Sequence, residues 1–268
     1  MKKMLLLLTG LLLTACTEKK EPGEAISIAR PKDSVALPVA GVKGFEGDKV
    51  PVLCYHAIRE VLPTDGPDQK AYSVSPGNFA AQMRALAENG YTTVSPEDLR
   101  LYLTKKTPLP EKPIVITFDD GRKDQFSIAA PEMEKHGFKG VFYIMTVSLG
   151  RKNYMAKADV KTLSDKGHTI GLHTWDHHKV TGYKGDDWEI QIEKPKKMLE
   201  ALIEKEVNSF AYPYGVWNIA AADSLKNRGF NTAFIFYGKQ DPSRPMYTLE
   251  RINGPNLSDM AKFLERIK

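Results

Sequence analysis

Cysteine is scarce in this chain of 268 residues, which contains only Cys16 and Cys54. If Cys16 is used as argued below, no intrachain disulfide remains, and Cys54, in an apolar run, is interpreted as a small core residue. A strong charge of one sign is also lacking, since 38 basic and 33 acidic residues give a formal net charge of +5. So small and dispersed an excess does not indicate a nucleic-acid partner. The hydrophobic fraction of 42% is enough for a globular core.

The N-terminal apolar run is too short to span a bilayer. Lys2 and Lys3 precede a leucine-rich run over 4–13, and Leu13-Thr14-Ala15-Cys16 follows. This arrangement resembles a bacterial lipoprotein signal, which implies that residues 1–15 are removed and that Cys16 is lipidated. We therefore expect export across the inner membrane and a lipid anchor at the cell envelope. An ordinary secretory signal, or a buried helix with a chance cysteine, are the alternatives.

Sustained periodicity is missing from residues 16–48, which mix both charges with several prolines and glycines. This composition is typical of a linker, so we predict a tether between the anchor and a domain over 49–268. No internal repeat and no low-complexity tract is present.

Strand and helix patterns alternate along the rest of the chain. We expect helices opened by Ser75-Pro76 and Ser95-Pro96, since a serine cap followed by proline favours a helix start. The expected strands are 50–55, 91–94, 114–118, 141–145, 169–173, 210–212 and 232–236, and further helices are expected over 124–136, 156–166, 187–205, 217–228 and 257–267. Between the first strand and the first helix we expect a long loop. This alternation predicts an α/β fold with parallel strands, and its length suits one barrel better than two domains.

Two polar motifs directly follow apolar strand patterns. Thr117-Phe118-Asp119-Asp120-Gly121 is the first, and His173-Thr174-Trp175-Asp176-His177 is the second. The carboxyl ends of parallel strands are where such folds carry their chemistry. One carboxylate and two imidazoles suit a metal that activates water, and the second carboxylate is left to act as a base. Because His173 ends a strand, the loop after it must turn back to bring His177 inward.

At these residues the sequence resembles the polysaccharide deacetylase family, carbohydrate esterase family 4. Phe210-Ala211-Tyr212-Pro213-Tyr214-Gly215 is similar to its third motif. The resemblance implies a distorted (β/α)7 barrel, a divalent metal and hydrolytic removal of acetyl groups from a glycan. By position, it makes Asp119 the general base and gives the metal to Asp120, His173 and His177. The backbone N–H of Tyr214 would face the oxyanion. Zinc is the expected metal, with nickel, cobalt or iron as alternatives.

The chain departs from the family pattern at two places. Ala211 stands where many members have an arginine that pairs with the base, and Arg251 is the candidate replacement, a surface arginine being the alternative. No histidine follows His178, although many members place their acid late in the chain. His56 is the candidate acid, a histidine at the rim of the core being the alternative. The Tyr-His pattern at 55–56 resembles the branch that acts on poly-β-1,6-N-acetylglucosamine. A spacing of five also occurs in that branch, so His178 is the second choice for the ligand at His177.

The sequence therefore predicts a metal-dependent enzyme that removes N-acetyl groups from an envelope or extracellular polysaccharide. Trp175, Tyr212 and Trp217 are candidate sugar contacts, because aromatic faces suit pyranose rings. An O-acetyl esterase with the same residues, an inactive glycan-binding lipoprotein and a non-haem iron oxygenase are the alternatives. The adjacent Asp119 argues against the oxygenase, which needs no second carboxylate there.

Overall fold

The computed structural model describes residues 45, 47 and 49–268, all within the second of the chain's two compact units, Pro38–Lys268. The predicted signal 1–15, the predicted lipidation site Cys16 and most of the predicted tether 16–48 lie outside the described residues. At the tether's end, Phe45 packs against the ring of Tyr102, whose hydroxyl donates to the carbonyl of Gly47. None of the helices in the described part is long and apolar enough to cross a membrane.

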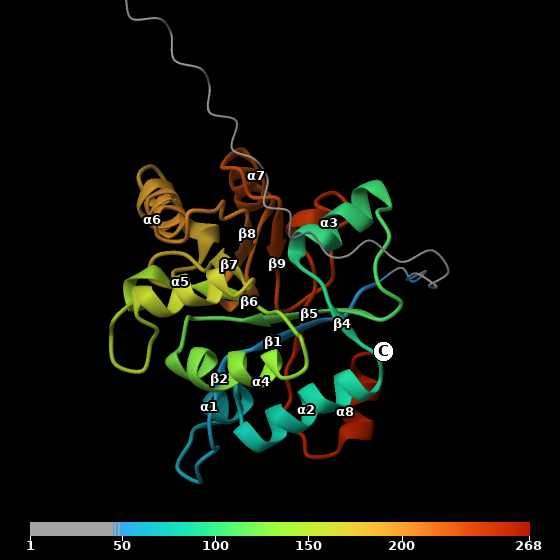
Figure 1. The fold of residues 1–268 in the computed structure, drawn as a ribbon. Helices are drawn as coiled ribbons and strands as arrows, with labels where there is room; N and C mark the ends of the chain where they lie inside the picture. The colour runs from blue at the N-terminus through green and yellow to red at the C-terminus, as the bar shows by residue number, and fades with distance from the viewer. Residues whose placement is uncertain (1–44, 46, 48) are drawn as a thin grey trace, which may run out of the picture. The chain divides into compact units, whose positions relative to one another are not determined.

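A curled parallel sheet forms the centre of the fold (Figure 1). Its strand order is β10-β1-β5-β6-β7-β8-β9, and β4 pairs with the start of β5. Leu249 pairs with Phe234 at one edge, and Ile252 pairs with Leu53 at the other, so the chain between them links the two outer strands. The strands are β1 (Val52–Tyr55), β4 (Thr92–Thr93), β5 (Pro113–Phe118), β6 (Val141–Ile144), β7 (Thr169–Leu172), β8 (Ser209–Ala211), β9 (Thr232–Phe234) and β10 (Ile252–Asn253). The predicted distorted (β/α)7 barrel in a single domain is confirmed.

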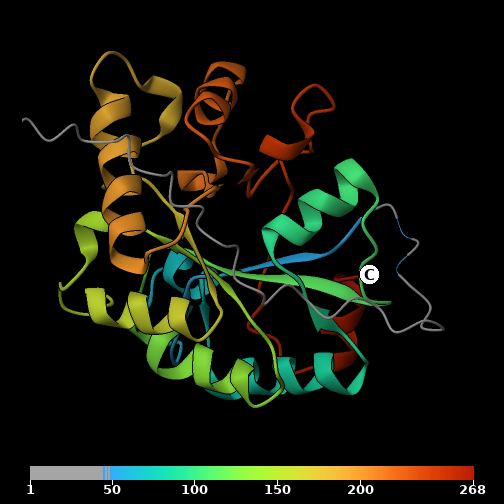
Figure 2. The same cartoon turned by 45° about the horizontal axis from the view of Figure 1, so that its top comes forward.

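Helices lie around the outside of this sheet, as the turned view in Figure 2 also shows. They are α2 (Pro76–Glu88), α3 (Pro96–Lys105), α4 (Ala130–Glu134), α5 (Lys157–Asp165), α6 (Lys194–Ile203), α7 (Ile219–Asn227) and α8 (Met260–Arg266). The predicted starts of α2 and α3 are confirmed, because the hydroxyls of Ser75 and Ser95 accept the first free backbone N–H groups. Phe79, Met83 and Leu86 of α2 are buried in the main core, on the face expected for a helix that covers a sheet.

The segment predicted as a long loop after β1 contains short elements. The strands β2 (Ala57–Ile58) and β3 (Ser73–Val74) pair in parallel, and α1 (Pro67–Ala71) lies between them. The N–H of Ala57 donates to the carbonyl of Tyr72 at 3.0 Å. The loop prediction was wrong here, because pairing of residues far apart holds these strands, and two-residue strands carry no periodicity of their own.

Two predicted helices begin with a wider π-helical turn, over Gln125–Ala129 before α4 and over Glu189–Glu193 before α6. Each turn directly precedes a proline, Pro131 or Pro195, within the first positions of the following α-helix. Proline has no N–H to donate, and its ring clashes with the carbonyl four residues earlier, so a local widening accommodates it.

Alternation along the strands determines which side chains face the inside of the barrel. Val52 on β1 and Val115 on β5 belong to a small inner cluster of buried apolar residues, and the next residues on the same faces are Cys54 and Thr117. One step further along each strand direction come His56 and Asp119. The strands thus carry an apolar inner layer that gives way to polar groups at their carboxyl ends.

Candidate active site

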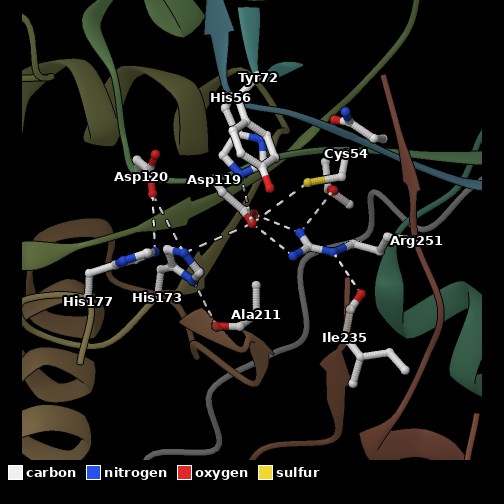
Figure 3. A network of polar contacts seen from close by, with 12 residues as sticks. Cys54, His56, Tyr72, Asp119, Asp120, His173, His177, Ala211, Ile235 and Arg251 are labelled. Carbon is white, nitrogen blue, oxygen red and sulfur yellow. Dashed lines mark hydrogen bonds and ion pairs between the residues drawn. The ribbon is translucent and has the colours of Figure 1, made fainter. Parts of the chain in front are cut away.

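The predicted catalytic motifs stand just beyond the carboxyl ends of β5 and β7. The N–H of Asp119 donates to the carbonyl of Tyr55, and the N–H of His173 donates to the carbonyl of Ile144, both at 3.0 Å. These hydrogen bonds continue the parallel pairing by one residue, which holds both motifs against neighbouring strands. Figure 3 shows the side chains of Asp119, Asp120, His173 and His177 converging, with that of Arg251 beside Asp119.

Asp120, His173 and His177 form a compact group of potential metal ligands. Their ligand atoms all lie within 4.8 Å of one another. The Oδ1 atom of Asp120 is 3.6 Å from the Nε2 atoms of both His173 and His177. These spacings fit a cation among the three atoms, because zinc takes nitrogen and oxygen ligands at about 2 Å.

The two imidazoles are prepared for such a role. Nδ1 of His173 donates to the carbonyl of Ala211 at 2.7 Å, which leaves the lone pair of Nε2 directed at Asp120. Burial, followed by the nearby His173, lowers the pKa of His177 to about 4. A neutral imidazole at neutral pH is the form that binds a metal.

Left-handed backbone conformations make the loop turn back as the sequence required. Asp120 has a φ of 77°, Thr174 of 66° and His177 of 71°. The hydroxyl of Thr174 accepts the N–H of His177 at 2.9 Å, which closes the turn. Non-glycine residues rarely adopt this region. Three of them at one site indicate that this backbone conformation is maintained because it positions the side chains.

His178 lies outside the ligand group. Its side chain is 72% exposed, and its Nδ1 pairs with Oδ1 of Asp176 at 2.6 Å. Between the two sequence choices, the structure therefore places His177, and not His178, beside Asp120 and His173.

Asp119 and Arg251 form a buried ion pair behind this group. The two guanidinium nitrogens Nη1 and Nη2 donate to Oδ1 and Oδ2 of Asp119 at 2.7 and 2.8 Å. Burial alone would raise the pKa of Asp119, but the charge of Arg251, assisted by His173 and His56, holds it well below its usual value. Arg251 is 7% exposed, so it is not a surface arginine. Its guanidinium pairs with Asp119 in place of the arginine that is absent at Ala211.

His56 lies on the other side of Asp119, with its Nε2 3.9 Å from Oδ2 of the carboxylate. Its ring packs against those of Tyr72 and Phe236, at centroid distances of 4.8 and 5.7 Å. Burial lowers its pKa, against the opposing charges of Asp119 and Asp120. Tyr72 and Phe236 were missed by sequence reasoning, because nothing in their local pattern distinguishes them from core aromatics.

Cys54 is buried as predicted, but it also contacts the predicted base, with Sγ 3.7 Å from Oδ2 of Asp119. Burial raises the pKa of this thiol, so it remains a donor to the carboxylate. Cys54, His56 and Asp119 form a second group with ligand-like spacing. Both oxygens of Asp119 already accept hydrogen bonds from Arg251, so a cation there would compete with the guanidinium. We assign no metal to this second group.

A cavity of about 720 Å³ opens above these groups. Asp119, Asp120, His56, both candidate ligand histidines and Arg251 line it, together with Tyr72, Tyr212, Tyr214 and Tyr237. Tyr214 has a left-handed backbone (φ 59°, ψ 9°) in the turn after β8, and its exposed ring packs on His177 at 4.5 Å. These residues surround a pocket large enough for a sugar unit beside the polar cluster.

The three residues predicted to contact sugar lie in different environments. Tyr212 lines the cavity, but its ring is fully buried in the main core. Trp175 is 40% exposed and Trp217 packs against the core, and neither is among the residues that line the cavity in the described part. Their role in binding sugar stays a prediction.

Comparison with known proteins finds similarity to polysaccharide deacetylases. Residues 106–233 match the family model described as polysaccharide deacetylase. YxkH of Bacillus subtilis, which is named provisionally as a polysaccharide deacetylase, is 26% identical over 94% of this chain and 88% of its own length. A poly-β-1,6-N-acetyl-D-glucosamine N-deacetylase of Staphylococcus aureus is 26% identical over 75% of this chain and 77% of its own.

A solved structure shares the fold. The Streptococcus pyogenes deacetylase PplD, solved in complex with acetate, superposes with a TM-score of 0.73 at 21% identity. The match covers 82% of this chain and 98% of that one. The matched family segment contains Asp119, Asp120, His173 and His177, whereas His56 and Arg251 lie outside it.

Proposed function

This chain belongs to the polysaccharide deacetylase family, and from that premise we propose that it hydrolyses N-acetyl groups of a polysaccharide that contains N-acetylglucosamine. The reaction cleaves a linear amide and releases acetate. The observation that carries this proposal is the buried Asp119–Arg251 pair beside the group Asp120, His173 and His177. One carboxylate, Asp119, is available to accept a proton, while the other, Asp120, belongs to the set of potential metal ligands. The name of the Staphylococcus aureus relative supports an N-linked acetyl group as the target.

A divalent metal fits the residues present. One carboxylate and two imidazoles form a donor set that suits zinc, and the hydrogen bond from His173 to Ala211 fixes the orientation of one imidazole. Nickel, cobalt and iron accept the same donors, so they remain alternatives. When bound, such an ion supplies a Lewis acid that polarises the acetyl carbonyl and lowers the pKa of water.

Asp119 acts as the general base in the proposed reaction. The carboxylate takes a proton from the attacking water, and Arg251 keeps it ionised and correctly turned. The water oxygen adds to the acetyl carbon, and the backbone N–H of Tyr214 donates to the carbonyl oxygen as negative charge develops there. The left-handed turn at Tyr214, directly after β8, supports this donor.

His56 acts as the general acid. The C–N bond breaks as the imidazolium donates a proton to the departing nitrogen, so that the sugar leaves as an amine and the acetyl group as acetate. The proton removed from water replaces the one given to nitrogen, which balances the reaction. The separation of 3.9 Å between Nε2 of His56 and Oδ2 of Asp119 supports this return of the proton within the site.

We further propose that the enzyme is exported and anchored at the cell envelope through lipidated Cys16. The support is the sequence of the leader alone, with its two lysines, short apolar run and small residues before the cysteine. The substrate is then a polysaccharide of the envelope or the cell exterior.

Acetate release from a panel of acetylated glycans, with and without a chelator, tests this function. We expect release from poly-β-1,6-N-acetylglucosamine that stops with chelator and returns with added zinc, and no release by the Asp119→Asn variant. Release from acetylated xylan alone would make the protein an O-acetyl esterase. Glycan binding without acetate release from any substrate would make it the inactive binding protein.

A further inference from the structure

Gln125 is a fully buried polar residue that the reaction above does not use. It opens the π-helical turn that follows the Asp119-Asp120 motif. Its side-chain Nε2 lies 2.7 Å from the carbonyl oxygen of His56 and 2.5 Å from that of Asp119. Because both partners only accept, the amide nitrogen and not its oxygen must face them, and its two hydrogens serve one carbonyl each.

These two carbonyls belong to the residues that carry the proposed acid and the proposed base. Paired positions of β1 and β5 end at Tyr55 and Phe118, so both carbonyls lie just past the ladder. Gln125 therefore ties the two strand ends together where strand pairing stops. The carbonyl of Asp119 also belongs to the peptide bond that leads into Asp120, whose φ of 77° is unfavourable for a non-glycine residue.

The amide oxygen of Gln125 is buried and has no hydrogen-bond partner among the described residues. An unpaired buried oxygen lowers stability, and an apolar side chain of equal size would avoid that loss. The two donated hydrogen bonds are therefore the useful property of this side chain.

We infer that Gln125 is a positioning residue that holds the Asp119–Asp120 peptide and the strand end of His56 in register. The inference rests on the proposed function, because that function makes Asp119 the base and Asp120 a metal ligand. Loss of the amide would let the Asp119–Asp120 peptide rotate, which moves the ligand carboxylate relative to the imidazoles of His173 and His177. It would also let His56 drift relative to Asp119.

The test compares Gln125→Met with Gln82→Met in the full chain. Gln82 is an equally buried glutamine whose side chain also makes two hydrogen bonds. It accepts from the hydroxyl of Tyr55 and donates to the carbonyl of Pro255, and neither partner is a proposed catalytic residue. Both variants replace an amide by an apolar side chain of similar size, so both should lower Tm. Zinc affinity by chelator competition, Tm, and kcat and KM at saturating zinc are measured for each.

We expect zinc affinity and kcat to fall by about 10–100-fold in Gln125→Met, the usual effect of losing an outer hydrogen bond to a site, with KM changed less than kcat. Gln82→Met should keep both values close to those of the wild type. Equal zinc affinity and equal kcat in the two variants, at comparable Tm, would overturn the inference.

If Gln125→Met does not fold, Gln125→Asn replaces it, because the shorter amide keeps the site polar but cannot reach both carbonyls. A folded Asn variant with wild-type zinc affinity and kcat would also overturn the inference. Should the wild type release no acetate from any glycan, the proposed function fails, but zinc affinity alone still decides the role of Gln125.

Discussion

Asp119 and Asp120 are adjacent in the chain but face two different halves of the site. Asp119 is 2% exposed and fully engaged by Arg251, whereas the side chain of Asp120 is 25% exposed and faces two imidazoles. Asp120 has a left-handed backbone with a φ of 77°, and its carboxylate lies 3.6 Å from the Nε2 atoms of both histidines instead of pairing with Arg251. The same functional group thus becomes a shielded ion in one half and an available ligand in the other.

Removing one of the predicted metal ligands Asp120, His173 and His177 has the largest expected effect. Asp120→Asn and His173→Ala should each lose bound metal and fall to background activity, since each removes one donor of a group of three. His178→Ala is the matched control, because His178 is exposed and paired with Asp176, and it should keep both properties. Metal content by mass spectrometry, measured with acetate release, checks this. Metal loss in His178→Ala with retention in His177→Ala would reverse the ligand assignment.

Replacing the proposed acid should leave both carboxylates in place. His56→Gln keeps a polar side chain but cannot deliver a proton, so kcat should fall by about 10²–10⁴-fold while bound metal is unchanged. Steady-state kinetics on an N-acetylated glycan, with metal content, are the measurement. A kcat within a few fold of the wild type would remove His56 from the reaction.

Loss of Arg251 removes the partner of the buried Asp119 carboxylate. Without the guanidinium, burial dominates and the pKa of Asp119 rises. A base with a raised pKa is protonated over a wider acid range, so the acid limb of the pH–rate profile should move to higher pH in Arg251→Ala. Arg251→Lys should recover part of the shift, since an ammonium cannot repeat the two-pronged contact. An unmoved acid limb in Arg251→Ala would show that Arg251 does not tune the base.

The same variant tests how much the ion pair of Arg251 and Asp119 contributes to the free energy of unfolding. Removing one partner of a buried ion pair typically costs about 3–5 kcal/mol, so denaturant unfolding of Arg251→Ala should show a loss of that order. In the wild type, the lowered pKa of Asp119 means that its ionised carboxylate stabilises the fold fully at pH values above the unfolded pKa. That contribution is lost as pH falls from there through the lower pKa of the folded state. The stability of Arg251→Ala should therefore fall less than that of the wild type as the pH is lowered through this range.

The smallest effect is expected outside the site. Cys16→Ser should release the protein from membranes and leave kcat and metal content unchanged, because the site is built from residues beyond the predicted tether. Membrane fractionation with an activity assay checks this. Unchanged membrane association would argue for another anchor.

The sequence predicted the part of the site that depends on strand ends. Apolar runs before Thr117 and His173 mark buried strands, and parallel strands bring their carboxyl ends to one edge, so Asp119, Asp120 and His173 could be expected to meet. Arg251 could be proposed only as a replacement for the arginine absent at Ala211. Its approach to Asp119 depends on the linkage between β9 and β1, which no local pattern shows.

The parts that sequence reasoning missed are held by contacts between distant residues. The pairing of Ala57 with Ser73 creates strands where a loop was expected. Tyr72 and Phe236 pack against His56 from segments far apart in the chain. Gln125 acts on backbone carbonyls, which every residue has, so its partners cannot be read from residue types.

The most direct test of the division between the two carboxylates is the metal content of Asp119→Asn, measured with its rate of acetate release. Asparagine keeps the size of the side chain and one oxygen but cannot take a proton from water. We predict one equivalent of metal, as in the wild type, and a rate lower by about 10²–10⁴-fold. Loss of the metal together with activity would place Asp119 among the ligands and contradict the account.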